Sequence, residues 1–365
     1  MNKGKLRPEL ELMLRLSHPS CTEQKAHTLL SNLPVDFDWQ YFIDRAIATH
    51  FAGYLLPYPT LNETFYPEGI LKKIKAYQHR ILLHGTLLRE ACLKIATILN
   101  QEKKPYAILK GFDLHFRNSI SLKTRQISDI DILIDENDLE SIAHVLEAQG
   151  YTIIRHQYKS KWHQQWLKTH APMSAKQESV SIDIHTNAVD QVHQIPFEIN
   201  LKELSQISVN GTQVNMLAPE VSNLFLKVHA YKHLNALSNL KPSMLIDLYQ
   251  LNQSTAAKEN ELNKMIYEMD GFTNRVHTLN FNQKHLFDQF FLKQLAGEKL
   301  NLTFRIKRIF KRLRPVKSIY KSIVLLYFDL FPQKSFLIYR FGNGNYVLLL
   351  FKRIFDAFGK SYGEK

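Results

Sequence analysis

The stretch RQISDIDILID, residues 125–135, combines the pattern of a buried strand with two carboxylates. Side chains alternate across a strand, so residues i and i+2 lie on the same face, and we expect Asp129 and Asp131 to point the same way. Like charges held together among apolar neighbours are costly unless a cation neutralises them. The pair therefore predicts a metal site, and a solvated strand end is the ordinary alternative.

A second strand-like segment, SVSIDIH at residues 179–185, carries a third carboxylate, Asp183. Clustered carboxylate oxygens suit Mg²⁺, which takes one or two protein carboxylates and completes its octahedron with substrate phosphates and water. His185 lies two residues after Asp183 and hence on the same face. We expect it to contact an acceptor or a phosphate, and a hydrogen bond to a carboxylate is the alternative.

A glycine turn precedes the acid pair in YAILKGFDL, residues 106–114, where Lys110 and Gly111 follow a short apolar strand. Glycine lets the backbone approach a ligand closely, and N–H groups at the start of a helix favour phosphate. We expect Lys110, Gly111 and Arg125 to bind the phosphates of a substrate. An ordinary strand-to-helix turn is the alternative for Lys110 and Gly111.

Hydrophobic periodicity changes along the chain. Residues 8 to about 100 have apolar residues at helical spacing, with Asp36 or Asp38 as a predicted N-cap. The strands predicted next cover residues 105–109, 129–134 and 179–185. Between them, a helix is predicted from a cap at Asn137 or Asp138 to Gly150, and Asn210-Gly211 predicts a β-hairpin over residues 207–217. Helices return over residues 219–253.

The pattern predicts an α+β fold, a small mixed β-sheet core flanked by N-terminal and C-terminal helical regions. We expect an N-terminal helical region over residues 1–100 and the α/β core over residues 101–217. A helical region over residues 218–290 would pack on this core, and a basic, aromatic-rich helical tail would follow over residues 291–365. At 365 residues, more than one packed unit is expected.

Cysteine content and hydropathy indicate the compartment. Cys21 and Cys92 are the only cysteines, and the polar start lacks the apolar region of a signal peptide, so we expect a cytoplasmic protein. The longest apolar candidate, SIVLLYFDLF at residues 322–331, is too short for a membrane span and contains Asp329.

The net charge of +13 belongs to the tail, because residues 293–365 hold 16 Lys and Arg against 4 Asp and Glu. Three interpretations are open: a packed helical subdomain with a basic solvated face, peripheral contact with an anionic membrane on its inner face, or nucleic-acid binding. Nucleic acid ranks lowest, since no recognised reader motif accompanies the charge.

Together, the segments LKGFDL, SDIDILI and IDIH resemble a bacterial family of uncharacterised nucleotidyltransferases, within the superfamily related to DNA polymerase β. The resemblance extends over roughly residues 10–255. It implies a nucleotidyltransferase core, and transfer of a nucleoside monophosphate from an NTP to an unidentified hydroxyl or phosphate acceptor. That family is often found with genes for surface polymers, which implies a role in surface polysaccharide metabolism.

The resemblance also implies roles for the carboxylates. Asp129 and Asp131 would hold Mg²⁺ on the triphosphate, and Asp183 would ligate a second ion and orient or deprotonate the acceptor. Two ions are expected, with Mn²⁺ as a substitute for Mg²⁺. The superfamily usually has Gly-Ser or Gly-Gly where this chain has Lys110, Gly111 and Phe112, so how the triphosphate is held is open.

Other residues have weaker signals. His229 and His233 lie four apart on a predicted helix, a spacing that can bind zinc, but no third ligand is evident. They are alternatively contacts for nucleotide or acceptor. Asp247 matches a recurrent position of the family or forms a helix salt bridge, while Asp113 and Asp135 are expected to be capping or solvated residues.

Two other functions compete with small-molecule nucleotidyl transfer. One is a binding or scaffold protein that keeps the fold without turnover, and the other is a nucleotidyltransferase that modifies RNA. The three aspartates favour an enzyme over a scaffold. Labelling of RNA by a labelled NTP would distinguish the second alternative.

Overall fold

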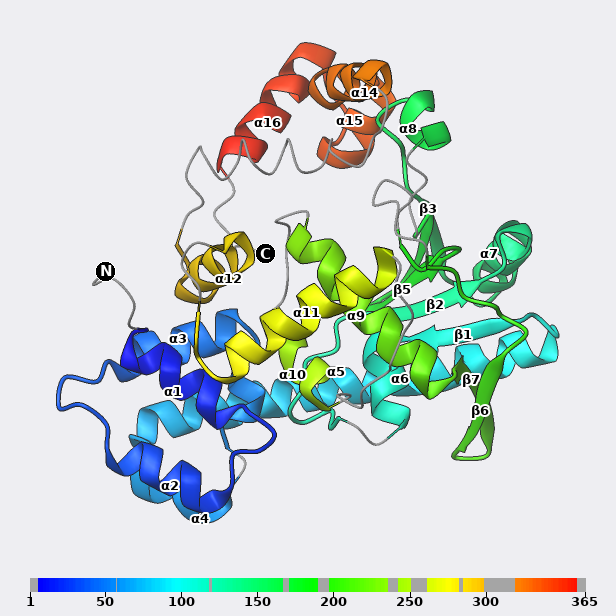
Figure 1. Ribbon diagram of the computed structural model, residues 1–365. Helices are drawn as coiled ribbons and strands as arrows, with labels where there is room; N and C mark the ends of the chain where they lie inside the picture. Colours follow the sequence, from blue (N-terminus) through cyan, green and yellow to red (C-terminus); the bar gives the residue numbers. More distant parts are fainter. Residues whose placement is uncertain are drawn as a thin grey trace.

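A computed structural model of the protein describes nine stretches of the chain (Figure 1). They are residues 6–56, 58–117, 120–166, 171–189, 197–235, 242–250, 261–281, 285–298 and 319–359. The strands gather into one sheet, the N-terminal helices lie beside it, and the last three helices form a separate group at the top of the view. The predicted small mixed sheet with flanking helices is confirmed.

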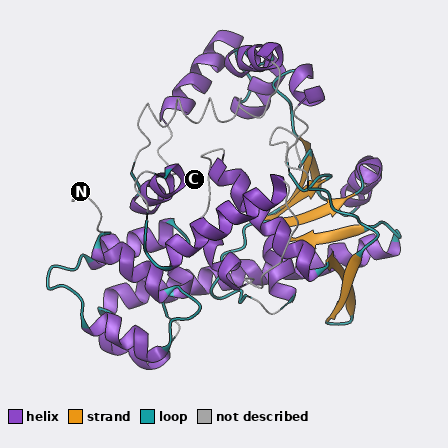
Figure 2. Ribbon diagram, in the orientation of Figure 1, coloured by secondary structure: helices purple, strands orange, loops and turns teal. Residues whose placement is uncertain are grey.

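The strands, orange in Figure 2, form one sheet. It has seven strands among the described residues, in the order β3-β4-β5-β2-β1-β7-β6. It is mixed, because β2 pairs in parallel with β5 and β1 with β7, while the other pairs are antiparallel. The strands are β1 (Tyr106–Leu109), β2 (Ile130–Ile134), β3 (Thr152–Arg155), β4 (Met173–Gln177), β5 (Val180–His185), β6 (Leu204–Val209) and β7 (Thr212–Leu217).

The central strands form where the sequence is largely apolar: β1 is YAIL and β2 is IDILI, in which Asp131 is the one charged residue. Every residue of β1 and β2 is buried, as expected of strands covered on both faces. The β6–β7 hairpin turns at Asn210 and Gly211, whose φ angles of 51° and 79° suit the predicted tight turn, since type I′ needs positive φ at both positions. Strands β3 and β4 were not predicted from the sequence.

The helices fall into three groups along the chain. The N-terminal group is α1 (Pro8–Leu16), α2 (Glu23–Ser31), α3 (Trp39–Ala48), η1 (Ala52–Tyr54), α4 (Pro59–Phe65) and α5 (Glu68–Gln101). Those within and after the core are α6 (Lys110–Phe116), η2 (Glu136–Asp138), α7 (Leu139–Ala148), α8 (Lys161–Trp166), α9 (Pro219–Asn235), α10 (Met244–Gln250), α11 (Glu261–His277) and α12 (Leu286–Ala296). The last group is α14 (Ile319–Leu330), α15 (Lys334–Phe341) and α16 (Tyr346–Gly359).

The helix caps follow the sequence in part. The Asp38 carboxylate accepts a hydrogen bond from the backbone N–H of Tyr41, so the predicted cap of α3 is confirmed. Asp138 occupies the predicted N-cap position of α7, but its side chain makes no capping hydrogen bond and accepts one from Lys104 instead. Asp135 caps the preceding turn η2, in agreement with its predicted role.

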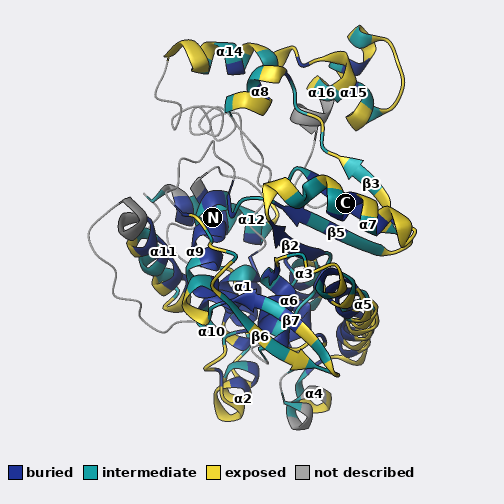
Figure 3. Ribbon diagram, turned by 90° about the vertical axis from the view of Figure 1, so that its right-hand side faces the viewer, coloured by how far each residue is buried: buried dark blue, intermediate teal, exposed yellow. Residues whose placement is uncertain are grey.

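One hydrophobic core joins the N-terminal helices, the sheet and helices α9–α12, running from Leu10 to Leu295. The C-terminal helices are outside it, and the large apolar side chains that they bury, among those the structure describes, are Leu325, Leu337 and Leu349. Figure 3 shows the contrast, with dark central strands and largely exposed C-terminal helices. None of the described helices is both long and apolar enough to cross a bilayer.

Candidate active site

Strand register brings two of the three predicted carboxylates together. Asp131 of β2 lies directly opposite Asp183 of β5, and Ser174 of β4 lies opposite Asp183 on its other side. Paired residues on neighbouring strands face the same side of a sheet, so these three side chains share one face. Asp129 precedes β2 by one residue, and its Oδ1 accepts a hydrogen bond of 3.1 Å from Ser128 Oγ.

Asp131 is the most enclosed member of this row. The residue is 4% exposed, and its Oδ1 lies 2.5 Å from Lys110 Nζ and 2.7 Å from His185 Nε2. Burial raises the pKa of the Asp131 carboxyl, but the Lys110 charge and the His185 hydrogen bond more than offset this and hold it well below its usual range. Asp131 is therefore ionised at neutral pH. The alternative for His185, a histidine bonded to a carboxylate, is confirmed.

The turn between β1 and α6 places the lysine beside Asp131. Leu109, the last residue of β1, is the register partner of Asp131, so Lys110 follows directly. Its φ of 54° is left-handed, a conformation that costs a side-chain-bearing residue about 1 kcal/mol. A Cβ on Gly111 would lie 3.1 Å from Ile127 Cγ1 and 3.2 Å from Arg125 Nη1. A larger residue here would have to displace the side chains of Arg125 and Ile127 by a few tenths of an ångström, so glycine lets them pack closely against the turn.

Arg125 forms a buried ion pair with Asp247 of α10. Its Nε lies 2.9 Å from both carboxylate oxygens and its Nη2 lies 2.8 Å from Oδ2, with side chains 15% and 2% exposed. Burial alone would lower the pKa of Arg125, but Asp247, with smaller effects from Tyr54 and Asp129, raises it. The alternative prediction for Asp247, a salt bridge, is confirmed. Phosphate binding by Arg125 stays a prediction, since Asp247 engages its guanidinium here.

A hydrogen-bond chain runs from Asp183 to the C-terminal helices, and sequence reasoning did not find it. Ser174 Oγ donates to Asp183 Oδ1 at 3.0 Å, His156 Nε2 lies 2.7 Å from Ser174 Oγ, and His156 Nδ1 lies 2.7 Å from the Tyr339 hydroxyl. Burial lowers the pKa of His156, so the imidazole is neutral. Ser174 Oγ gives its one hydrogen to Asp183, so it must accept a hydrogen bond from His156 Nε2. A neutral imidazole carries only one N–H, so Nδ1 is an acceptor and the Tyr339 hydroxyl donates to it.

The carboxylates of Asp131 and Asp183 fit a hard divalent cation, because they present oxygen donors on one face of the sheet. Within the described ranges, no group of three or more His, Cys, Asp and Glu side chains is gathered as a metal-binding cluster. Ion binding by Asp129, Asp131 and Asp183 together therefore stays a prediction.

The remaining predicted residues have other surroundings. The expectation for Asp113 is wrong, because it is 1% exposed and bonds Arg117 and Ser222. Burial raises its pKa. His229 and His233 of α9 contact each other, with Nε2 atoms 3.3 Å apart.

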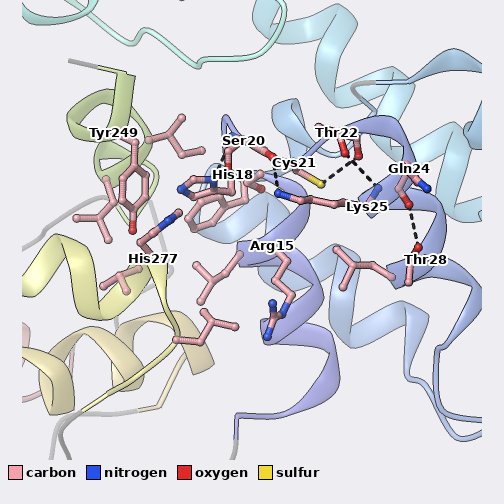
Figure 4. A pocket seen from close by; sticks show the side chains of 18 residues that line it. Arg15, His18, Ser20, Cys21, Thr22, Gln24, Lys25, Thr28, Tyr249 and His277 are labelled. Atoms are coloured by element: carbon pink, nitrogen blue, oxygen red, sulfur yellow. Dashed lines mark hydrogen bonds between the residues drawn. The ribbon is translucent and has the colours of Figure 1, made fainter. Parts of the chain in front are cut away.

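A cavity of about 620 Å³ lies between the N-terminal helices and helices α10 and α11 (Figure 4). His18 lies against Tyr249 and His277 on one wall, with ring centroids 4.7 and 4.0 Å away, while Cys21 and Lys25 contribute to another part of the lining. Burial, with the nearby charges of His277 and Lys25, lowers the pKa of His18 to about 4. The lining contains none of the residues predicted for nucleotidyl transfer.

Comparison with known proteins identifies one matching family. The model of a family described as "Uncharacterised nucleotidyltransferase" matches residues 35–270, a range that contains every predicted site residue. No curated protein matches the chain.

Solved structures give weaker likenesses. A solution structure of the antibiotic-resistance factor ANT(2'')-Ia is 15% identical, with a TM-score of 0.32, and the match covers 51% of this chain and 91% of that one. A crystal structure of ANT(2'')-Ia with adenylyl-2''-tobramycin is 12% identical, with a TM-score of 0.31, covering 51% and 95%. Similarity this low carries no argument about substrate.

Proposed function

The chain belongs to the family of uncharacterised nucleotidyltransferases, and from this premise we propose that it moves a nucleoside monophosphate from an NTP to an acceptor. The observation that carries the proposal is the register of β2 and β5. It sets Asp131 and Asp183 side by side on one face of the sheet, next to the Lys110 ammonium.

The reaction needs positioning and charge more than covalent chemistry from the protein. An acceptor hydroxyl or phosphate oxygen forms a bond to the α-phosphorus, the bond between the α-phosphorus and the bridging oxygen breaks, and pyrophosphate leaves. Any acceptor proton passes to a carboxylate or to water. Asp183 is proposed to orient the acceptor and take its proton.

Asp129, Asp131 and Asp183 are proposed to hold Mg²⁺, in two sites, with Mn²⁺ able to replace it. Bound ions of this kind neutralise phosphate charge and stabilise the attacking and leaving oxygens. Lys110 is proposed to bind phosphate from its place beside Asp131, and Gly111 to keep the turn compact. Ser174 fixes the Asp183 carboxylate through its donated hydrogen bond.

The acceptor and the cellular setting belong to the same proposal. We infer an acceptor in surface polysaccharide metabolism and a cytoplasmic site of action, both from the family resemblance. Retention of the fold without turnover is the competing function. It is favoured by one observation, the occupation of Asp131 Oδ1 by both Lys110 and His185.

Thermal unfolding with ATP, GTP, CTP and UTP, each with and without Mg²⁺, tests the proposal. We expect one nucleotide to raise the Tm of the wild type only with metal, and the Asp129→Asn/Asp183→Asn variant to lose that shift. Asp36→Asn removes an exposed carboxylate far along the chain from the site and is the matched control.

The shift should be followed by measurement of pyrophosphate release with candidate acceptors. Stabilisation by an NTP without any release would favour the non-catalytic function. No stabilisation by any of the four nucleotides would contradict nucleotide binding altogether.

A further inference from the structure

The C-terminal helices α14, α15 and α16 expose an unusual number of large apolar side chains. Among the described residues, sixteen such side chains are exposed, and eleven of them lie between Ile319 and Ile354. Soluble monomers rarely expose contiguous apolar patches of this kind unless the patch binds something. The concentration in one small group of helices therefore indicates a binding surface.

On α14 the exposed apolar residues follow one side of the helix. Ile319, Ile323, Tyr327 and Leu330 are 80%, 62%, 56% and 55% exposed and recur at intervals of three or four. This spacing places them on a single face. The opposite side supplies the buried Leu325.

Helix α16 repeats this arrangement. Leu348, Phe351 and Ile354 are 63%, 54% and 42% exposed, again three residues apart, with Val347 beside them. Leu349 is its buried contact with the rest of the group. Both helices are thus amphipathic, but the apolar face that should form a core faces outwards.

This group has a positive net charge. Residues 319–359 contain five cations, Lys321, Lys334, Arg340, Lys352 and Arg353, and two acids, Asp329 and Asp356. Burial raises the pKa of Asp329, but His163 and Lys159 of the body more than offset this and hold it well below its usual range. The helices that expose the apolar faces therefore carry more positive than negative charge.

We propose that α14 and α16 bind the surface of an anionic bilayer, with their apolar stripes in the interface and their cations at the headgroups. Basic amphipathic helices bind membranes in this way, and each Lys or Arg near an anionic surface adds attraction. A second copy of the chain is a poorer occupant, because two surfaces of the same positive charge would repel each other. The proposal goes beyond nucleotidyl transfer and does not depend on it.

The attachment of this group to the body gives the binding surface a fixed relation to the candidate active site. Gln333 N donates to Lys159 O at 2.9 Å, and Tyr339 of α15 reaches Asp183 through His156 and Ser174. A bilayer bound to α14 and α16 would therefore keep the body and its candidate active site near the membrane. Such a location suits an acceptor carried at a lipid surface.

Co-sedimentation of the full chain with vesicles tests the proposal. We expect binding to vesicles that contain phosphatidylglycerol, weaker binding at high salt, and at least about tenfold weaker binding to pure phosphatidylcholine. Ile323→Ser/Leu348→Ser/Phe351→Ser should abolish binding. The matched control is Leu83→Ser/Leu87→Ser, which alters side chains 53% and 58% exposed on α5 and should bind as wild type.

A second variant keeps the test decisive if the apolar triple variant does not fold. Lys334→Gln/Lys352→Gln changes two exposed lysines and should weaken binding about fivefold for each charge removed. Equal binding to both kinds of vesicle, or wild-type binding by the triple variant, would overturn the proposal. If light scattering shows that the wild type is a dimer and the triple variant is a monomer, the proposal is overturned in favour of self-association.

Discussion

The body of the protein, from α1 to α12, and the C-terminal group of α14 to α16 distribute the same kinds of residue in opposite ways. In the body, aromatic and aliphatic side chains form one core, and buried charges are paired, as Arg275 is with a wholly buried Asp288. Among the described side chains of the C-terminal group, three leucines are buried and eleven large apolar side chains are exposed.

The two regions therefore differ in how much apolar surface they bury, which is the surface that stabilises a fold. Burial of apolar surface is the main favourable contribution to folding, so the body has what it needs to fold and the C-terminal group has little of its own. Described polar contacts between them include Lys159 with Asp329 and His156 with Tyr339. The group is thus held by the body, while its apolar faces remain exposed.

The largest effect is expected from a substitution in the body that removes the negative charge of Asp183. Asp183→Asn should lower kcat/KM for nucleotidyl transfer by about 100-fold or more, because the amide cannot accept a proton from the acceptor. Vesicle binding should be unchanged, which would separate catalysis in the body from binding by α14 and α16. Steady-state kinetics with the nucleotide found by thermal shift measures it, and activity within a factor of a few of wild type would exclude Asp183 from the chemistry.

The buried pair of Arg125 and Asp247 tests how far the body depends on paired charge. Asp247→Ala should cost about 3–5 kcal/mol of unfolding free energy, because it leaves a buried guanidinium without its partner. Replacing both residues, Arg125→Met/Asp247→Leu, should recover most of that loss. Urea denaturation of the wild type and both variants supplies the numbers. If the double variant is no more stable than Asp247→Ala, packing of α10 matters more than the charge.

The strands at the centre of the sheet could be predicted because each is marked by its own short stretch of sequence. The apolar run of β1, the nearly apolar run of β2 and the alternation of β5 identify these strands, and Asn210-Gly211 identifies the hairpin. Strands β3 and β4 were not predicted, since β3 has exposed ends and MSAKQ of β4 has only Met and Ala as apolar residues, without the β-branched or aromatic residues typical of strands. Strand β4 is held in the sheet by its antiparallel pairing with β5. A contact of this kind cannot be read from the sequence of β4 alone.

The site was predictable in its carboxylates but not in its hydrogen bonds. Asp131 and Asp183 could be matched from two strands, whereas His156 is a lone histidine whose partners come from β4 and α15. Asp113 had an available signal, since Arg117 follows it at the i+4 spacing of a helical ion pair. The ion pair of Arg125 had no local signal, because its partner Asp247 lies 122 positions away.

A smaller effect is expected where the two regions meet. Asp329→Asn should increase hydrogen exchange in α14 about tenfold, because the bond of a charged group to Lys159 is lost, while α5 is unaffected. The pKa of Asp329 is lowered on folding, so its contribution is complete above the unfolded value of about 3.9 and is lost as pH falls through the folded value. Exchange in α14 that stays at the wild-type rate would mean that this ion pair does not hold the group.

The smallest expected effect is also the most specific. Tyr339→Phe removes one hydroxyl, which donates to His156 Nδ1, and should cost about 0.5–1.5 kcal/mol in the protection of α15. His156 then has no donor to fix its tautomer, so the orientation of Ser174 and Asp183 should loosen and kcat should fall while KM for the NTP stays constant. Hydrogen exchange and steady-state kinetics measure the two effects.

Tyr267→Phe is the matched control, because Tyr267 is 81% exposed on α11. If Tyr339→Phe and Tyr267→Phe are indistinguishable in both measurements, the chain from α15 to Asp183 has no mechanical role and the two regions act independently. If only the hydrogen-exchange protection of α15 changes, the Tyr339 hydroxyl helps to hold the C-terminal group on the body but has no influence on catalysis. A fall in kcat that His156→Gln reproduces would show that the C-terminal helices, and whatever surface they bind, set the position of the acceptor-binding carboxylate.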